Sequence, residues 1–329
     1  MKILVLNNPS PAEEFARFLD EGELEIRPAL AERGVAAAAE AIINGAAACG
    51  IGPVEQYPNC RIVVRMGVGY DNLDLAAWGA LGVPVCNVPD YGTTEVADHA
   101  IALMLSLVRG TAHYAPAIVA DPVRGWDYSA APLVRRLRGA TFGVLGLGRI
   151  GLAAALRARG FGMEIVFHDP YVAPGIELSL GARRVHSVAA LMAESDVVSV
   201  HTPLNDETRG IISTAAFAAA KPGLVLVNTA RGPLVDIDAL QEALRDGLIG
   251  GAALDVLAQE PPDPEHPLIR ALVEGAPWTR GRLVLTPHAA FYSPAGVEDL
   301  RRKSVEVVVA YLRDGRLTNC VNREMLRRN

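Results

Sequence analysis

Three residues of types that support catalysis stand at near-equal intervals in the last third of the chain. They are Arg231, Glu260 and His288, separated by 29 and 28 residues. An arginine can hold a carboxylate through two parallel hydrogen bonds. A histidine titrates near neutral pH and can exchange a proton with a hydroxyl group, and a neighbouring carboxylate would fix its tautomer. The three types together fit hydride chemistry at a carbonyl beside a carboxylate.

Each of the three residues comes shortly after an apolar run that reads as a β-strand: LVLVNTA, GAALDV and RLVLTP. Ligands of open parallel sheets bind beyond the carboxyl ends of the strands. The spacing equals about one strand and one helix, so the three side chains are expected to meet on one rim of a sheet. Taken singly, each also fits an ordinary loop or strand-end residue.

Three further runs, TFGVLGLG, MEIVFHD and DVVSVH, precede these from Thr141 onward. All six are rich in Val, Leu and Ile and alternate little between apolar and polar residues, which is typical of parallel strands buried on both faces. Helix-like segments separate them; in IDALQEALRDG, Asp236 or Asp238 can cap the start and Gly247 can end the helix. The pattern predicts a six-stranded, doubly wound α/β sheet of the Rossmann type.

A glycine-rich segment, GLGRIG, lies between the first of these strands and the following helix. Such a turn lets a pyrophosphate approach the backbone at a helix N-terminus. Asp169 follows the next strand and can accept hydrogen bonds from an adenosine ribose, which favours NAD over NADP. The predicted cofactor is NAD, bound first of all by Gly146, Leu147, Gly148, Arg149, Ile150, Gly151 and Asp169.

The first hundred residues repeat the strand and helix theme more weakly, with KILVL, ELEIR, RIVVRMG and VPVCNVP as candidate strands. The chain has 329 residues, enough for two domains. The tail GVEDLRRKSVEVVVAYLRDGR reads as one long helix that returns to the smaller domain. We therefore expect a smaller, flavodoxin-like α/β substrate domain from residues 1–100 and 290–329, and an NAD-binding domain from residues 101–289.

Composition excludes several other classes. A net charge of -6 argues against a general nucleic-acid binder, and no apolar run is long enough to span a membrane. The four cysteines have no C-x-x-C spacing, so no metal site is expected. Without a secretion signal they are interpreted as reduced thiols of a cytoplasmic protein.

These motifs together resemble the D-isomer-specific 2-hydroxyacid dehydrogenase family over nearly the whole chain. The resemblance implies that Arg231 binds the substrate, Glu260 supports the histidine, and His288 is the acid/base. It also implies the D stereochemistry. The matching segments are RMGVGYDNLDL, CNVPDYGTTEVADHAIALML, GVLGLGRIG, NTARGPLVD, GAALDVLAQEP and TPHAAFYS.

Further roles follow from the same resemblance. Val68 and Gly69 match a loop that offers N–H groups to the substrate carboxylate, and Arg65 would add a charge near them. Thr94 is expected near the nicotinamide, although it also fits a helix N-cap, and Asp255 is expected to hold the carboxamide. The residues expected to line the cofactor groove are Thr202, Pro203, Thr229 and Ala230.

Within that family the chain looks most similar to the branch of the C-terminal-binding-protein corepressors. Phe291 stands where those proteins have a tryptophan in the substrate pocket, so their substrate preference is not transferred. Two alternatives therefore stay open: an NAD(H)-sensing interaction protein with weak or no turnover, and a 3-phosphoglycerate dehydrogenase. The resemblance also implies a homodimer, for which residues 113–138 are the expected contact arm.

Overall fold

The computed structural model describes residues 2–8, 10, 13–19, 25–29, 33–45 and 52–326. The chain forms two compact units. Unit 1 consists of Met1–Gly92 and Tyr292–Asn329, and unit 2 of Thr93–Phe291. Residue 100, where the sequence suggested a boundary, lies inside a helix that belongs wholly to unit 2.

Unit 2 contains a seven-stranded parallel sheet in the order β12-β11-β10-β9-β6-β7-β8. When β6 to β12 are renumbered 1 to 7 and the order is given from the other edge, it is 3-2-1-4-5-6-7. This is the Rossmann order 3-2-1-4-5-6 with one further strand after the sixth. The sequence predicted six of the strands and missed β8, a two-residue edge strand. The strands are β6 (Thr141–Leu145), β7 (Glu164–His168), β8 (Arg183–Arg184), β9 (Val197–Val200), β10 (Val225–Asn228), β11 (Gly251–Leu254) and β12 (Leu283–Leu285).

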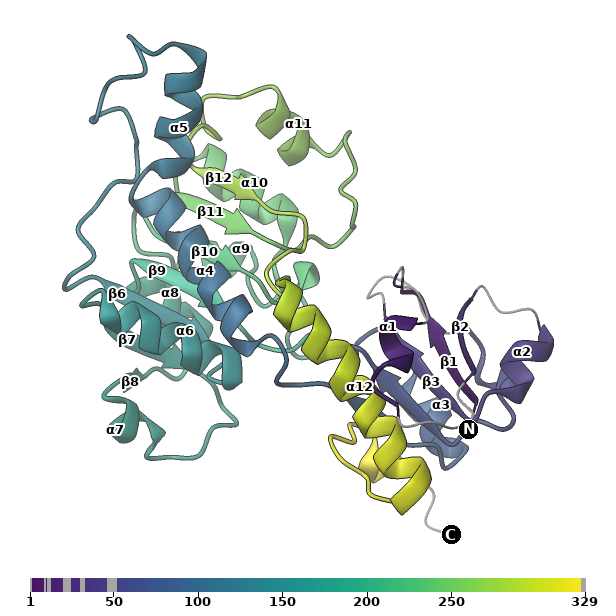
Figure 1. Ribbon diagram of the computed structural model, residues 1–329. Coiled ribbons are helices and arrows are strands. Elements are labelled where there is room, and N and C mark those ends of the chain that lie inside the picture. Colours follow the sequence, from purple (N-terminus) through teal and green to yellow (C-terminus); the bar gives the residue numbers. More distant parts are fainter. Residues whose placement is uncertain are drawn as a thin grey trace. The chain divides into compact units, whose positions relative to one another are not determined.

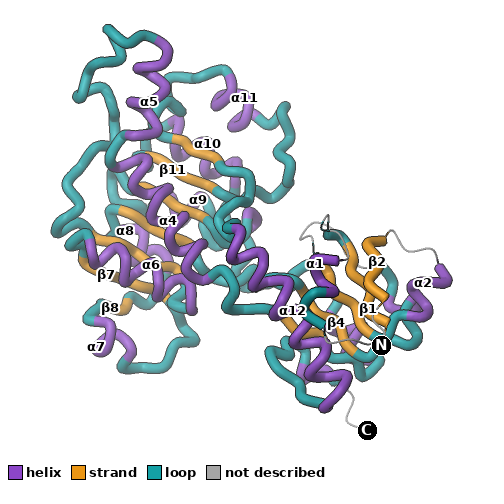
Figure 2. The backbone as a smooth tube through the Cα atoms, viewed as in Figure 1, coloured by secondary structure: helices purple, strands orange, loops and turns teal. Residues whose placement is uncertain are grey.

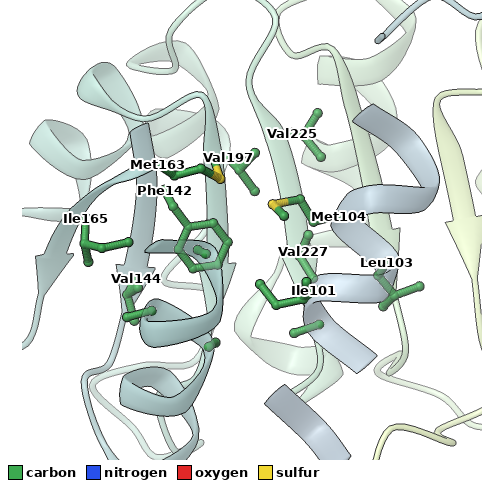
Figure 3. Close-up of a cluster of buried hydrophobic side chains, with 14 of the residues drawn as sticks. Ile101, Leu103, Met104, Phe142, Val144, Met163, Ile165, Val197, Val225 and Val227 are labelled. Atoms are coloured by element: carbon green, nitrogen blue, oxygen red, sulfur yellow. The ribbon is translucent and has the colours of Figure 1, made fainter. Parts of the chain in front are cut away.

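Helices cover both faces of this sheet (Figures 1 and 2). Successive strand residues point to opposite faces, so Val197 joins one apolar core and Val198 the other. The first core contains residues of α4 and α6 and is drawn in Figure 3; the second contains residues of α8 to α11. The helices are α4 (Thr93–Val108), α5 (Thr111–Ala120), α6 (Arg149–Gly160), α7 (Ile176–Leu180), α8 (Val188–Glu194), α9 (Thr214–Ala218), α10 (Ile237–Arg245) and α11 (Pro267–Val273), with the short 3-10 helix η2 (Gly232–Leu234).

Unit 1 contains a five-stranded parallel sheet in the order β2-β1-β3-β4-β5, which is the flavodoxin-like order. The sequence missed β3, the central strand. The strands are β1 (Lys2–Leu6), β2 (Glu25–Ala29), β3 (Ala41–Asn44), β4 (Ile62–Arg65) and β5 (Val85–Asn87). The helices are α1 (Glu13–Ala16), α2 (Arg33–Ala38), η1 (Val54–Gln56), α3 (Leu75–Ala80), α12 (Pro294–Asp314) and η3 (Arg323–Met325).

The long C-terminal helix is confirmed as α12, and it belongs to unit 1. Ser293 caps its start by accepting a hydrogen bond from Gly296 N, and Pro294 occupies the first helical position, where a missing N–H costs nothing. The helix ends at Gly315, whose φ of 66° lies in the left-handed region. Val305 and Val308 of α12 join the core on one face of the unit 1 sheet.

Among the described residues, no helix is long and apolar enough to cross a membrane. The cytoplasmic location expected from the sequence stays a prediction. Cys60, Cys86 and Cys320 are free thiols, while Cys49 lies outside the described residues.

Candidate active site

The glycine-rich loop joins β6 to α6, as the sequence predicted. Gly146 has a φ of 90°, and a Cβ there would lie 2.8 Å from Thr202 N. A Cβ at Gly151 would collide with the carbonyl oxygen of Gly146. Both glycines are therefore required, the first by its backbone conformation and the second by close packing of the helix against the loop.

Two observations test whether this loop fits a dinucleotide. Gly148 is the N-cap of α6, and a Cβ at that position would meet no atom within 4 Å. The loop therefore has open space beside the helix N-terminus, where a phosphate is favoured. Directly after β10, two strands from β6 in the same sheet, Thr229 Oγ1 is buried without a hydrogen-bond partner among the described residues. An open backbone cradle and an unused buried hydroxyl fit a bound NAD.

Asp169 follows β7 and lies directly against the glycine-rich loop. Its Oδ2 accepts a hydrogen bond from Leu147 N at 2.8 Å, and its Oδ1 accepts one from Tyr171 N at 2.9 Å. Val172 N also donates to Oδ1, at 3.3 Å. The carboxylate is thus oriented by three backbone amides at the place where the fold puts an adenosine ribose. Arg149 and Ile150 are the first two residues of α6.

The remaining groove residues follow β9 and β10, on one side of β6 in the sheet. Thr202 and Pro203 come after β9, and the backbone of Thr202 touches Gly146. This contact joins the loops after β6 and β9, the two strands between which the chain order of the sheet reverses, which is the binding position in such sheets. Ala230 follows Thr229, and Asn228 Oδ1 accepts a hydrogen bond from Ala230 N at 3.0 Å.

Glu260 and His288 meet, although 28 residues separate them. His288 Nδ1 lies 2.7 Å from Glu260 Oε2, and Leu257 N donates to Glu260 Oε1 at 2.9 Å. Burial acts to raise the pKa of Glu260, but these hydrogen bonds outweigh it and the pKa lies below its ordinary value. The carboxylate is therefore ionised at neutral pH and can only accept, so His288 Nδ1 carries a proton. His288 Nε2 is the ring nitrogen left to face a substrate.

The backbone of His288 adopts a conformation that side chains avoid. Its φ of 52° lies in the left-handed region, which costs an L-residue roughly 1–2 kcal/mol. Strain of this kind persists only where surrounding contacts impose it, often at functional sites. The ring of Phe291 meets the His288 ring edge-on, with 6.1 Å between centroids and an interplanar angle of 82°. Phe291 thus helps to fix the orientation of the imidazole.

Arg231 lies at the end of the loop after β10 and is the N-cap residue of η2. Asn228 Nδ2 donates to the Arg231 carbonyl at 2.9 Å. A Cβ at Gly232 would collide with the backbone of Leu257, so the Arg231 loop packs tightly against the loop that ends at Glu260. The structure therefore brings Glu260 and His288 into contact and places the Arg231 loop beside them.

Asp255 follows β11 and is 2% exposed. Its Oδ1 accepts from Ala289 N at 2.9 Å and from Thr286 Oγ1 at 2.5 Å, and its Oδ2 accepts from Ala290 N at 2.9 Å. Burial acts to raise the pKa of Asp255, but hydrogen bonds from His99, Thr286 and the two amides lower it to about 2. Both oxygens have protein partners, so the carboxamide role expected for Asp255 stays a prediction.

Thr94 is the second residue of α4, and its hydroxyl donates to Glu95 Oε2 at 2.7 Å. The helix-cap interpretation of Thr94 is therefore wrong, because the helix already begins at Thr93. Its expected place near the nicotinamide is not decided by these contacts and stays a prediction.

In unit 1, the expected substrate residues lie at the carboxyl end of β4. Arg65 is the last residue of that strand and is 7% exposed. Its guanidinium donates to the Met66 carbonyl and lies against Gly67. Asn87 Nδ2 donates to the Val68 carbonyl at 2.7 Å and so fixes the loop that continues to Gly69. Substrate binding by this loop stays a prediction.

Residues 101–290 match the D-isomer specific 2-hydroxyacid dehydrogenase, NAD binding domain, family model. This chain belongs to that family. Its cofactor class is therefore NAD, and its enzyme class is oxidoreductase.

Several proteins are similar to this dehydrogenase over most of its length. C-terminal-binding protein 1 of Caenorhabditis elegans is 37% identical over 289 residues, which cover 84% of this chain but only 38% of that protein. A glyoxylate reductase of Aeropyrum pernix is 37% identical over 283 residues, covering 83% of this chain and 80% of that one. An NADPH-dependent glyoxylate/hydroxypyruvate reductase of Sinorhizobium meliloti, solved with NADP and malonate, is 30% identical with a TM-score of 0.84, covering 100% of this chain and 98% of that one.

Sequence reasoning missed two residues of this dehydrogenase that contact the catalytic region. His99 and Thr286 both interact with Asp255. Thr286 stands two residues before His288, and that proximity was an available signal. His99 lies on α4, far from Asp255 in the sequence, and no spacing rule connects them. No cluster of three or more metal-binding side chains occurs among the residues that the structure describes.

Proposed function

We propose that this protein interconverts a 2-ketoacid and the corresponding D-2-hydroxyacid with NAD(H) as the redox partner. The observation that carries the proposal is the Glu260–His288 hydrogen bond at the carboxyl edge of the sheet that also bears the glycine-rich loop. In the reducing direction, ketoacid, NADH and one proton give hydroxyacid and NAD⁺. Bound NADH supplies the hydride for this reaction.

The proton in this scheme moves through His288. Its Nε2 donates to the substrate oxygen in reduction and accepts the hydroxyl proton in oxidation. Glu260 stays ionised and holds Nδ1, so the imidazolium that forms in oxidation is stabilised by a full negative charge at 2.7 Å. The same pair therefore serves both directions of the reaction.

The substrate carboxylate is assigned to two groups. Arg231 holds it through two parallel hydrogen bonds and polarises the adjacent carbonyl. The backbone N–H groups of Val68 and Gly69 are assigned to the same carboxylate, as the resemblance to the family implies. Phe291 shapes the side-chain pocket, because its ring already lies against the imidazole of His288.

The assay that tests the proposal is oxidation of NADH against a panel of glyoxylate, hydroxypyruvate, 3-phosphohydroxypyruvate and larger apolar 2-ketoacids. We expect rapid reduction of at least one member. We also expect NADPH to support a slower reaction at equal concentration, because the fixed carboxylate of Asp169 repels a 2′-phosphate.

Absence of turnover with every panel member, while NADH still binds, would contradict the proposal. It would favour the NAD(H)-sensing alternative if NADH also changed the assembly state. Turnover of 3-phosphohydroxypyruvate alone would support the phosphoglycerate alternative. Equal rates with NADH and NADPH would contradict the role given to Asp169. The comparison is informative because the Sinorhizobium meliloti relative is an NADPH-dependent reductase.

We further propose that unit 2 pairs with a second copy of the chain through α5 and the loop after it. This segment lies at the rim of unit 2 (Figure 1). It carries four large apolar side chains that are exposed. Several exposed large apolar side chains on one short segment favour a protein interface, and aromatic side chains are enriched in interfaces. The residues are Val119, Val123, Trp126 and Tyr128, each at least 80% exposed.

Light scattering at micromolar concentration is expected to give twice the monomer mass for the wild-type protein. The double variant Trp126→Glu with Tyr128→Glu should scatter as a monomer, since it places charges in the apolar contact. Leu178→Glu is the matched control, because Leu178 on α7 is equally exposed but lies outside the segment. A monomeric wild type, or a dimeric double variant, would refute this interface.

A further inference from the structure

The turn that carries His288 is held by one buried residue, Asp255, through its backbone carbonyl and its side-chain carboxylate. His288 N donates to the Asp255 carbonyl at 2.8 Å. The next two amides, Ala289 N and Ala290 N, donate one to each oxygen of the Asp255 side chain. Asp255 therefore binds three consecutive backbone amides, and these contacts impose the left-handed conformation at His288.

The orientation of the Asp255 carboxylate depends in turn on two side chains. Thr286 Oγ1 lies 2.5 Å from Asp255 Oδ1 and 3.0 Å from His99 Nε2. The ionised carboxylate cannot donate, so the single hydroxyl proton of Thr286 goes to Asp255. His99 Nε2 must then donate to Thr286 Oγ1, and it also lies 3.5 Å from Asp255 Oδ1.

His99 belongs to a different secondary-structure element from Asp255 and Thr286. It lies on α4, which packs against β10, β11 and β12. Arg231, Asp255 and His288 lie in the loops that follow these three strands. The imidazole of His99 is partly buried, with 25% of its side chain exposed, while the Asp255 side chain is fully buried. The helix thus fixes the carboxylate against the strand ends.

We propose that His99 and Thr286, acting through Asp255, are positioning residues that hold His288 in the orientation needed for proton transfer. The expected effect on catalysis rests on the proposed function, whereas the expected effect on the orientation of His288 does not. Neither residue is assigned contact with substrate or cofactor. A shift of about 1 Å at a reacting group can lower a rate by about 10²-fold, so loss of this support should be visible in kcat.

Two pairs of variants test the support. Thr286→Val removes the hydroxyl at nearly constant volume, and Thr286→Ser restores it. His99→Leu removes the donor, and His99→Gln restores an N–H donor. We expect Thr286→Val and His99→Leu to lower kcat about tenfold or more. Thr286→Ser and His99→Gln should recover most of the lost rate. His186→Leu, at an exposed histidine of the same unit, is the matched control.

A second readout does not depend on turnover. His288 Nδ1–H, bonded to Glu260 at 2.7 Å, should give a low-field proton resonance, identified by its absence from His288→Asn. We expect this resonance to shift or broaden in Thr286→Val and His99→Leu, and to return in Thr286→Ser and His99→Gln.

These outcomes distinguish failure of the positioning role from failure of the proposed function. An unchanged resonance and unchanged kcat in both deletion variants would overturn the positioning role. So would equal losses in the deletion and restoring variants, because a merely structural defect is not rescued by a restored hydrogen bond. If the wild type reduces no ketoacid, the proposed function fails, and the resonance alone decides whether His99 and Thr286 position His288.

Discussion

Replacement of His288 by asparagine is expected to lower kcat for ketoacid reduction by about 10²–10⁴-fold, the usual contribution of a positioned acid/base group. Asparagine is the informative substitute because it tolerates the left-handed region, in which His288 lies at a φ of 52°. The backbone amides that bind Asp255 should therefore keep their places. What the variant loses is the imidazole that links Glu260 to the substrate.

The measurement is steady-state kcat with the preferred ketoacid, together with NADH affinity from fluorescence. The affinity should change little, because no cofactor-binding role is assigned to His288. His186→Asn serves as the control, since it makes the same substitution at an exposed histidine. A kcat within threefold of wild type would show that another group supplies the proton.

The sheet of unit 2 could be predicted because its strands carry a strong and uniform signal. Val and Leu dominate β9 and β10, which are buried on both faces, so no alternation of apolar and polar residues obscures the signal. β3 in unit 1 escaped prediction for a physical reason. Its four residues, Ala41–Asn44, lie in an alanine-rich stretch that has a high helix propensity. Pairing with β1 and β4 in the centre of the sheet overrides that local preference.

Some features of the candidate site could likewise be predicted from the sequence, and others could not. Glycines at 146 and 151 could be predicted because each meets a steric requirement that the turn itself creates. The meeting of Glu260 and His288 could be predicted because both follow adjacent strands at a regular interval. The support from His99 could not. Its place depends on how α4 lies across β11 and β12, and periodicity within a helix does not determine what the helix covers.

Replacement of Arg231 by lysine is expected to lower kcat/KM by about 10²-fold. The side chain keeps its positive charge, but lysine cannot form the planar two-pronged contact that orients a carboxylate. Loss of one charged hydrogen bond costs about 1.5–3 kcal/mol, which corresponds to about 10–150-fold in rate. The loss should appear in both KM and kcat, because the same guanidinium is assigned to binding and to polarising the carbonyl.

The fold of this variant should be intact. The loop around Arg231 is held by the close packing of Gly232 on Leu257 and by the bond from the Asn228 side chain to the Arg231 carbonyl, neither of which involves the guanidinium. The guanidinium also donates to the Ala230 carbonyl at 2.7 Å, a bond that the ammonium of lysine can replace. Arg209→Lys is the matched control, since Arg209 is an exposed arginine of the same unit. The kinetic constants of both variants are measured together with their thermal melting temperatures. A near-wild-type kcat/KM for Arg231→Lys would remove Arg231 from the proposed chemistry, because a point charge would then be enough.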